Sequence, residues 1–192
     1  MNFDNFRKYL TDNTDLTLQE IHSLQPLFSV KTFSKGDFLL LKGQISQNVF
    51  FVEKGLLRLY SIDDKGKEHI LQFAQENWWL SDRNNLCSDE PSSYYIDAYE
   101  DTTVILINHD FIVKASEMSE SFLEFHERIL QRHIERLYHR INLLIGSSAK
   151  DRYLAFTKTY PNIVQRVPQW MIASYLGITP EGLSRVRKEI TL

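Results

Sequence analysis

The C-terminal stretch of the sequence carries side chains that could contact DNA. Four of them, Ser184, Arg185, Arg187 and Lys188, fall within five residues. Arginine can donate two hydrogen bonds to a guanine edge, whereas lysine and serine can hold phosphate groups. The candidate DNA-contacting residues are Thr179, Glu181, Ser184, Arg185, Arg187 and Lys188.

A helix-turn-helix would place these side chains on one exposed face. Such a pair needs a small residue where the helices cross and a turn residue that tolerates positive φ, and Ala173 and Gly177 fit these positions. The residues predicted to be buried are Ile172, Leu176, Ile178, Leu183 and Val186. Thr179 is a suitable N-cap and Pro180 suits the first helical position. Glu181 could accept a hydrogen bond from cytosine or serve only as a helix cap.

Net charge first argues against a nucleic-acid partner, because the 192-residue chain carries −3 overall. The charge is unevenly distributed, however. Residues 147–192 contain 7 Lys and Arg against 3 Asp and Glu, whereas residues 1–146 contain 15 against 22. An acidic body with a basic tail indicates nucleic-acid contact by the tail alone.

The first half of the chain has the pattern of a small antiparallel β-structure. Residues 1–28 are predicted to be helical, with Thr17 and Glu20 as a capping box. Short apolar runs then alternate with glycine-containing turns, which is typical of a β-roll or jelly roll. The predicted strands are 38–41, 49–52, 56–60, 69–73, 94–99 and 103–107. The expected fold class is therefore α+β.

A long helix with a heptad pattern follows residue 110. Its predicted seam is Leu123, Leu130, Ile134, Leu137, Ile141 and Leu144, interrupted by Glu127. This helix could pack on its own β-roll, but a seam so narrow favours a parallel coiled coil between two subunits. The sequence Gly146-Ser147-Ser148 supplies a C-cap and a new N-cap, and a further helix is expected at 149–159. The predicted domains are 1–110, 111–146 and 147–192.

Taken together, these features resemble the Crp/Fnr regulators. Residues 33–37 and 50–55 are similar to the opening of their cyclic-nucleotide-binding domain, and residues 177–185 resemble their recognition stretch. The resemblance implies that Glu181 and Arg185 face base pairs. Pro180 stands where some members carry arginine, and Gly182 where a hydroxyl residue often touches phosphate. Members usually add a β-hairpin wing after the recognition helix, and we expect that wing to be reduced or absent.

The effector pocket implied by the resemblance departs from the family pattern. Cyclic-nucleotide binders carry Gly-Glu for the ribose and, about ten residues later, Arg-Ser or Arg-Thr for the phosphate. Here the matching segments are 79–82 and 91–93, and Ser92 takes the place of the arginine. An anionic phosphate then lacks its bidentate partner, so we predict no cyclic AMP binding. The candidate pocket residues are Ser81, Asp82, Arg83, Ser92 and Ser93.

Other ligands and reactions find less support in the sequence. The single cysteine, Cys87, excludes an intramolecular disulfide, a zinc ribbon and a four-cysteine cluster. A haem held by Cys87 or His69 is conceivable, although lone residues of this kind are usually structural, and we predict no cofactor. Trp78, Trp79, Tyr94 and Tyr95 could line an aromatic pocket or simply fill the core.

The remaining alternatives are a binding or interaction module without DNA contact and, least favoured, a cupin-like metal enzyme. The latter needs several converging histidines. Of six, His22, His126, His133 and His139 fall in predicted helices. We therefore expect a DNA-binding homodimer rather than an enzyme. Its partners would be double-stranded DNA, a second copy of the chain and an unidentified small-molecule effector.

The chain has no signal peptide and no run of about 18 apolar residues, which favours a cytoplasmic location without membrane contact.

Overall fold

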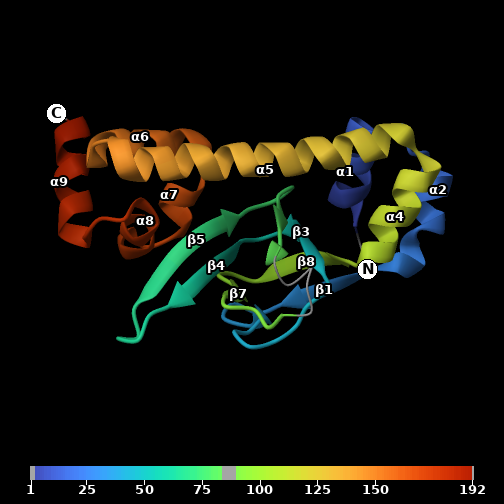
Figure 1. Ribbon diagram of the computed structural model, residues 1–192, viewed down its shortest axis with the longest axis horizontal. Coiled ribbons are helices and arrows are strands. Elements are labelled where there is room, and N and C mark those ends of the chain that lie inside the picture. Colours follow the sequence, from blue (N-terminus) through green and yellow to red (C-terminus); the bar gives the residue numbers. More distant parts are fainter. Residues whose placement is uncertain (1–2, 84–89, 192) are drawn as a thin grey trace. The chain divides into compact units, whose positions relative to one another are not determined.

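The computed structural model describes residues 3–83 and 90–191, and its secondary structure is of the α+β class (Figure 1). Contacts divide the chain into two compact units. The first contains Met1–Ser61 and Gln72–Ile129, and the second contains Ile62–Leu71 and Leu130–Leu192. The tip of one β-hairpin therefore belongs with the C-terminal helices.

The N-terminal segment is helical, as predicted. Its elements are α1 (Asp4–Asn13), α2 (Leu18–Ser23) and the 3₁₀ helix η1 (Gln25–Leu27). The Thr17–Glu20 capping box at the start of α2 is confirmed, because Glu20 donates its backbone N–H to the Thr17 side chain while its carboxylate accepts from the Thr17 backbone. These bonds satisfy two N–H groups that a helix start would otherwise leave without partners.

Within the described part of the chain, eight strands form two four-stranded sheets, in the orders β1-β8-β3-β6 and β2-β7-β4-β5. The strands are β1 (Phe28–Phe33), β2 (Phe38–Leu40), β3 (Val49–Lys54), β4 (Leu57–Ile62), β5 (Glu68–Ala74), β6 (Trp79–Leu80), β7 (Tyr95–Ala98) and β8 (Thr102–Ile107). The pairs β1–β8, β2–β7, β3–β6, β3–β8 and β4–β7 are antiparallel, which confirms the expected sheet type.

Two strands were not predicted from the sequence. Strand β1 begins at Phe28, where the prediction still has helix, and its polar residues Ser29 and Lys31 weaken the apolar signal. This strand lies at the edge of its sheet, so only part of it is buried. Strand β6 has two residues, too few to show a periodicity.

The core of the first unit is rich in aromatic side chains. Phe6 of α1 packs against Phe51 at 5.0 Å between ring centroids and against Trp79 at 5.9 Å. Phe122 and Phe125, near the start of α5 (Glu120–Gly146), belong to the same cluster, as does Phe111 of α4 (His109–Met118). Trp79 is partly buried and packs against this cluster, which favours the packing interpretation of this residue over the pocket interpretation.

The second unit contains most of α5, which is one continuous helix (Figure 1), and four helices that follow it. These are α6 (Ala149–Thr159), α7 (Ile163–Arg166), α8 (Gln169–Leu176) and α9 (Pro180–Thr191). The predicted N-cap of α6 is confirmed, because the Ser148 side chain accepts from the Asp151 backbone N–H. Among the described residues, no helix is long and apolar enough to cross a membrane.

Candidate nucleic-acid interface

Helices α8 and α9 form the predicted helix-turn-helix. Gly177 ends α8 with φ +65° and ψ +35°, a left-handed conformation that glycine adopts without steric cost. A Cβ at this position would lie 3.2 Å from Cδ2 of Leu144, so space as well as conformation favours glycine. Ala173 is buried where the helices cross and accepts a 3.0 Å hydrogen bond from the Ile178 N–H.

The apolar positions of the motif are also largely as predicted. The buried residues include Ile172, Leu176, Leu183 and Val186, whereas Ile178 is half-buried. Burial of Leu183 and Val186 fixes which face of α9 is turned inward. Because residues three and four apart share one side of a helix, the opposite face is available to a partner.

The start of α9 is capped by the predicted residues. Thr179 Oγ1 accepts a 3.1 Å hydrogen bond from the Gly182 N–H, and Pro180 is the first helical residue. The pKa of Glu181 is lowered by its own backbone N–H, by the Thr179 hydroxyl and by the charge of Arg185. Glu181 is therefore an ionised capping residue, and its contact with cytosine stays a prediction.

The exposed face of α9 presents most of the candidate DNA-contacting side chains. Glu181, Ser184, Arg185 and Lys188 are exposed and follow the spacing of a single helical face. Thr179 is exposed beside them in the turn. Arg187, by contrast, is half-buried and lies outside this face, toward the packed side of the helix.

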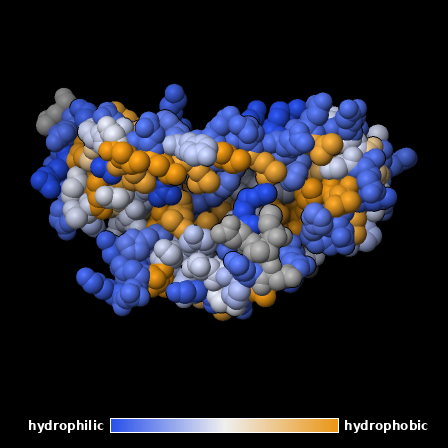
Figure 2. All heavy atoms as spheres, in the orientation of Figure 1, coloured by the Kyte–Doolittle hydropathy of each residue, from blue (hydrophilic) through white to orange (hydrophobic). Residues whose placement is uncertain are grey.

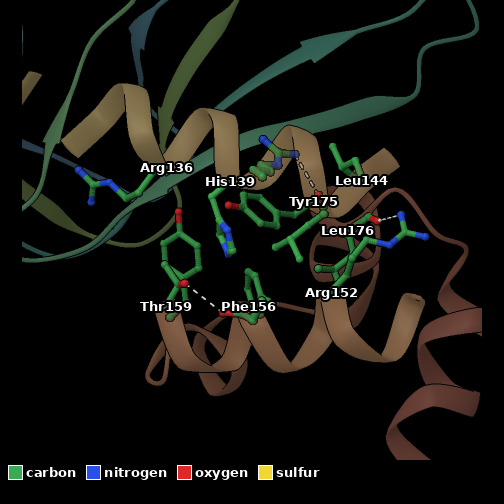
Figure 3. Close-up of a pocket in the computed structure, with 12 residues that line it drawn as sticks. Arg136, His139, Leu144, Arg152, Phe156, Thr159, Tyr175 and Leu176 are labelled. Carbon is green, nitrogen blue, oxygen red and sulfur yellow. Dashed lines mark hydrogen bonds between the residues drawn. The ribbon is translucent and has the colours of Figure 1, made fainter. Parts of the chain in front are cut away.

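Two arginines that the sequence analysis did not single out as functional hold α8 in place (Figure 3). Arg140 of α5 donates from Nη2 to the carbonyls of Tyr175 and Ile70, at 2.9 and 3.0 Å, and from Nη1 to the carbonyl of Leu71. Its guanidinium also lies 4.0 Å from the ring centroid of Tyr175. Arg152 of α6 donates to the Leu176 carbonyl at 2.8 Å. The helix-turn-helix is thus attached to α5 and α6 by charged groups.

The hairpin tip, residues 62–71, contacts the same helix through Ser174. The Ser174 hydroxyl accepts a 3.0 Å hydrogen bond from the Ile70 N–H and donates to the Glu68 carbonyl at 3.1 Å. Within this tip His69 Nε2 lies 2.9 Å from Asp63 Oδ2. That contact supports the structural interpretation of His69, while Cys87 lies outside the described residues.

The predicted seam of α5 is mostly exposed to solvent. Ile134, Leu137 and Ile141 are 46%, 44% and 51% exposed, and Leu123 and Leu144 are exposed as well. Figure 2 shows apolar side chains in a band along this helix. Leu130 is half-buried. Large apolar side chains at successive seam positions are unusual on a surface that stays in water.

The candidate effector residues are only partly brought together. The Ser92 hydroxyl donates a 2.6 Å hydrogen bond to Oδ2 of Asp82, and both residues are buried. Ser81 is half-buried, whereas Arg83 and Ser93 are exposed. Asp82, which the resemblance predicts at the ribose-binding position, is thus bonded to Ser92, which it predicts in place of the phosphate-binding arginine.

A buried ion pair that the sequence analysis did not foresee joins two strands of the same unit. Arg58 of β4 and Asp97 of β7 are paired in register, with both hydrogen bonds at 2.7 Å. Tyr60 donates a further 3.2 Å bond to Asp97, and the Arg58 guanidinium lies 4.3 Å from the Tyr60 ring centroid.

Within residues 3–83 and 90–191, no cluster of three His, Cys, Asp or Glu side chains suits a metal ion.

Comparison with known proteins shows similarity to a cyclic nucleotide-binding domain and to a transcriptional activator. Residues 30–117 match the family model of the cyclic nucleotide-binding domain. The transcriptional activator protein Anr of Pseudomonas aeruginosa is 27% identical over 188 residues, which cover 89% of this chain and 74% of Anr.

Solved structures share the fold at lower sequence identity. FixK2 from Bradyrhizobium japonicum is 18% identical with a TM-score of 0.72, and the match covers 85% of this chain and 84% of FixK2. A CooA mutant from Carboxydothermus hydrogenoformans is 22% identical with a TM-score of 0.67, over 93% of this chain and 85% of CooA.

In this chain a cyclic nucleotide-binding domain, over residues 30–117, precedes the helix-turn-helix of α8 and α9. In this arrangement the chain is similar to transcriptional regulators of the Crp/Fnr type. The resemblance inferred from the sequence is thereby confirmed.

Proposed function

We propose that this protein is a homodimeric regulator that binds double-stranded DNA through α9. The observation that carries the proposal is the exposed face of α9, which presents Ser184, Arg185 and Lys188. This helix follows the left-handed glycine, Gly177, that ends α8 in the helix-turn-helix. Arg185 would read a base edge in the major groove, and Ser184 and Lys188 would hold phosphates. Residues 147–192 would form the DNA-binding domain, in keeping with their basic charge.

Dimerisation would proceed through α5. The exposed seam supports a parallel coiled coil, since a second copy would cover Ile134, Leu137 and Ile141. Two recognition helices would then enter successive major grooves about 34 Å apart on a roughly palindromic site. Arg187, half-buried, would contribute less to this contact than the sequence suggests.

The effector domain would be degenerate with respect to cyclic nucleotides. Ser92 offers a phosphate no positive charge, and its bond to Asp82 occupies the carboxylate that would take a ribose hydroxyl. Binding an anion without charge-assisted donors is weak. Any effector in this domain would therefore have a chemistry different from that of cyclic AMP.

DNA selection tests the proposal. The full-length protein is used to enrich fragments from a random duplex library. Binding of the enriched duplexes is then compared by gel shift between the wild type and the Arg185→Ala variant. We expect a preferred, roughly palindromic sequence whose preference is relaxed in the variant. Lys158→Ala, which removes an exposed cation from α6, is the matched control and should bind as the wild type does. Failure to enrich any sequence would contradict the proposal.

A further inference from the structure

A cavity in the second unit lies between α5 and α6, with α8 at one side (Figure 3). Its volume is about 70 Å³, and the space widens from there into open solvent. The lining side chains are spaced three or four residues apart on both long helices, so each helix turns a single face toward the space. Those from α6 are Arg152, Ala155, Phe156 and Thr159.

One wall of the cavity is an aromatic cluster. The ring centroids of Phe156 and Tyr175 are 5.2 Å apart, and that of Tyr160 lies 5.1 Å from Phe156 and 5.6 Å from Tyr175. Burial, followed by electrostatic and hydrogen-bond interaction with Tyr175, raises the pKa of Tyr160 well above its ordinary value. Tyr160 is therefore uncharged at neutral pH, and the cluster is suited to a flat apolar ring.

The cavity lining contains basic side chains but no carboxylate. The basic residues are Arg136, His139, Arg140 and Arg152, and no Asp or Glu is among the described lining residues. Arg140 and Arg152 donate to backbone carbonyls. Carbonyl groups carry no net charge, so these hydrogen bonds do not neutralise the two guanidinium groups. In both residues the buried Nε atom has no hydrogen-bond partner among the described residues. A buried donor without an acceptor is costly, and an anion would relieve that cost.

We propose that this cavity binds a small aromatic carboxylate, with its ring against Phe156, Tyr160 and Tyr175 and its carboxylate toward the basic lining. In Figure 3 His139 and Tyr175 lie between α5 and α6, with Phe156 directed toward them. The ring matches the aromatic wall, and the charge matches the basic side chains. This site is separate from the exposed face of α9, so the proposal can fail while DNA binding stands.

Calorimetry on the full-length protein tests the ligand class with three compounds. Benzoate carries both ring and charge, benzamide carries the ring alone, and acetate carries the charge alone. We expect benzoate to bind with Kd below about 1 mM, which is modest for a ligand of about nine non-hydrogen atoms. Benzamide should bind at least about tenfold more weakly, and acetate should give no detectable heat.

Two pairs of variants locate the site. Ala155→Phe fills the cavity and should weaken benzoate binding at least about tenfold, whereas Leu154→Phe, at an exposed neighbouring position outside the lining, should not. His139→Glu places a negative charge at the lining and should weaken benzoate but not benzamide. Its control is Tyr138→Glu, which adds the same charge at a position outside the lining.

Three results would each overturn the proposal. The first is a benzoate Kd above about 10 mM for the wild type, too weak for a built site. The second is equal benzoate affinity in Ala155→Phe and the wild type. The third is equal affinity for benzoate and benzamide, which would remove the basis for an anionic ligand. Because His139 is exposed, His139→Glu should fold even where Ala155→Phe does not.

Discussion

The hydroxyl of Ser92 donates a 2.6 Å hydrogen bond to Oδ2 of Asp82. Both residues are buried, and the Ser92 backbone is fixed as well, because its N–H donates to the Gln44 carbonyl at 2.9 Å. The resemblance predicts that Asp82 stands at the ribose position of cyclic-nucleotide binders and that Ser92 takes the place of their phosphate-binding arginine. The two positions predicted to hold a nucleotide are thus bonded to each other.

The first prediction concerns cyclic nucleotides. We expect cyclic AMP and cyclic GMP to bind with Kd above about 1 mM, because Ser92 cannot form the charge-assisted bidentate bond that an arginine gives to a phosphate. Isothermal titration calorimetry with the full-length protein measures this directly. Micromolar affinity for either nucleotide would show that another cation takes the role of the arginine.

The second prediction concerns the buried pair of Arg58 and Asp97. Arg58→Met should lower the free energy of unfolding by about 3–5 kcal/mol, because it leaves the Asp97 carboxylate buried without its cation. The double variant Arg58→Met, Asp97→Leu should recover most of that loss. Urea denaturation of the wild type, the single variants Arg58→Met and Asp97→Leu, and the double variant gives the coupling energy of the pair. A double variant no more stable than the single one would contradict the account.

The third prediction concerns Arg140, which joins α5 to the hairpin tip and to Tyr175 of α8. Arg140→Met keeps the apolar stem but removes every hydrogen bond of the guanidinium. Hydrogen exchange should then accelerate at the backbone amides of α8, since their packing loses its attachment. Arg132→Met, at an exposed position of the same helix, is the control and should leave this exchange unchanged. Unaltered protection of α8 in Arg140→Met would refute the role.

The fourth prediction concerns the seam. Ile134→Glu should convert the proposed dimer to a monomer, because it places a charge at an apolar position of the seam. Light scattering coupled to size-exclusion chromatography gives the mass. Gln131→Glu introduces the same charge one turn earlier, outside the seam, and should remain dimeric. If Ile134→Glu is still a dimer, subunit contact lies elsewhere.

The parts of the fold that the sequence predicts well are those determined by neighbouring residues. The capping box of Thr17 and Glu20, the Ser148 cap and the left-handed Gly177 each depend on a few adjacent positions. The edge strand β1 and the two-residue β6 escaped prediction because their stability comes from partners far along the chain.

The functional site divides in the same way. The exposed face of α9 follows from helical spacing, so most of its residues could be named in advance. The contacts of Arg140 join it to residues 35, 69 and 70 positions away, and no local pattern marks them. Arg140 was therefore not among the candidate residues. The bond between Ser92 and Asp82 was likewise invisible, although both residues were candidates.

The dependence of DNA affinity on salt tests the central claim most directly. Fluorescence anisotropy of the full-length protein with its selected duplex gives the slope of log K against log salt concentration, which we expect to be steeper than about −3. In Lys188→Ala the slope should become shallower by about 2, because each subunit of the proposed dimer would lose one phosphate contact, while Lys158→Ala should leave it unchanged. A slope near zero, or one that Lys188→Ala does not alter, would contradict DNA binding through α9.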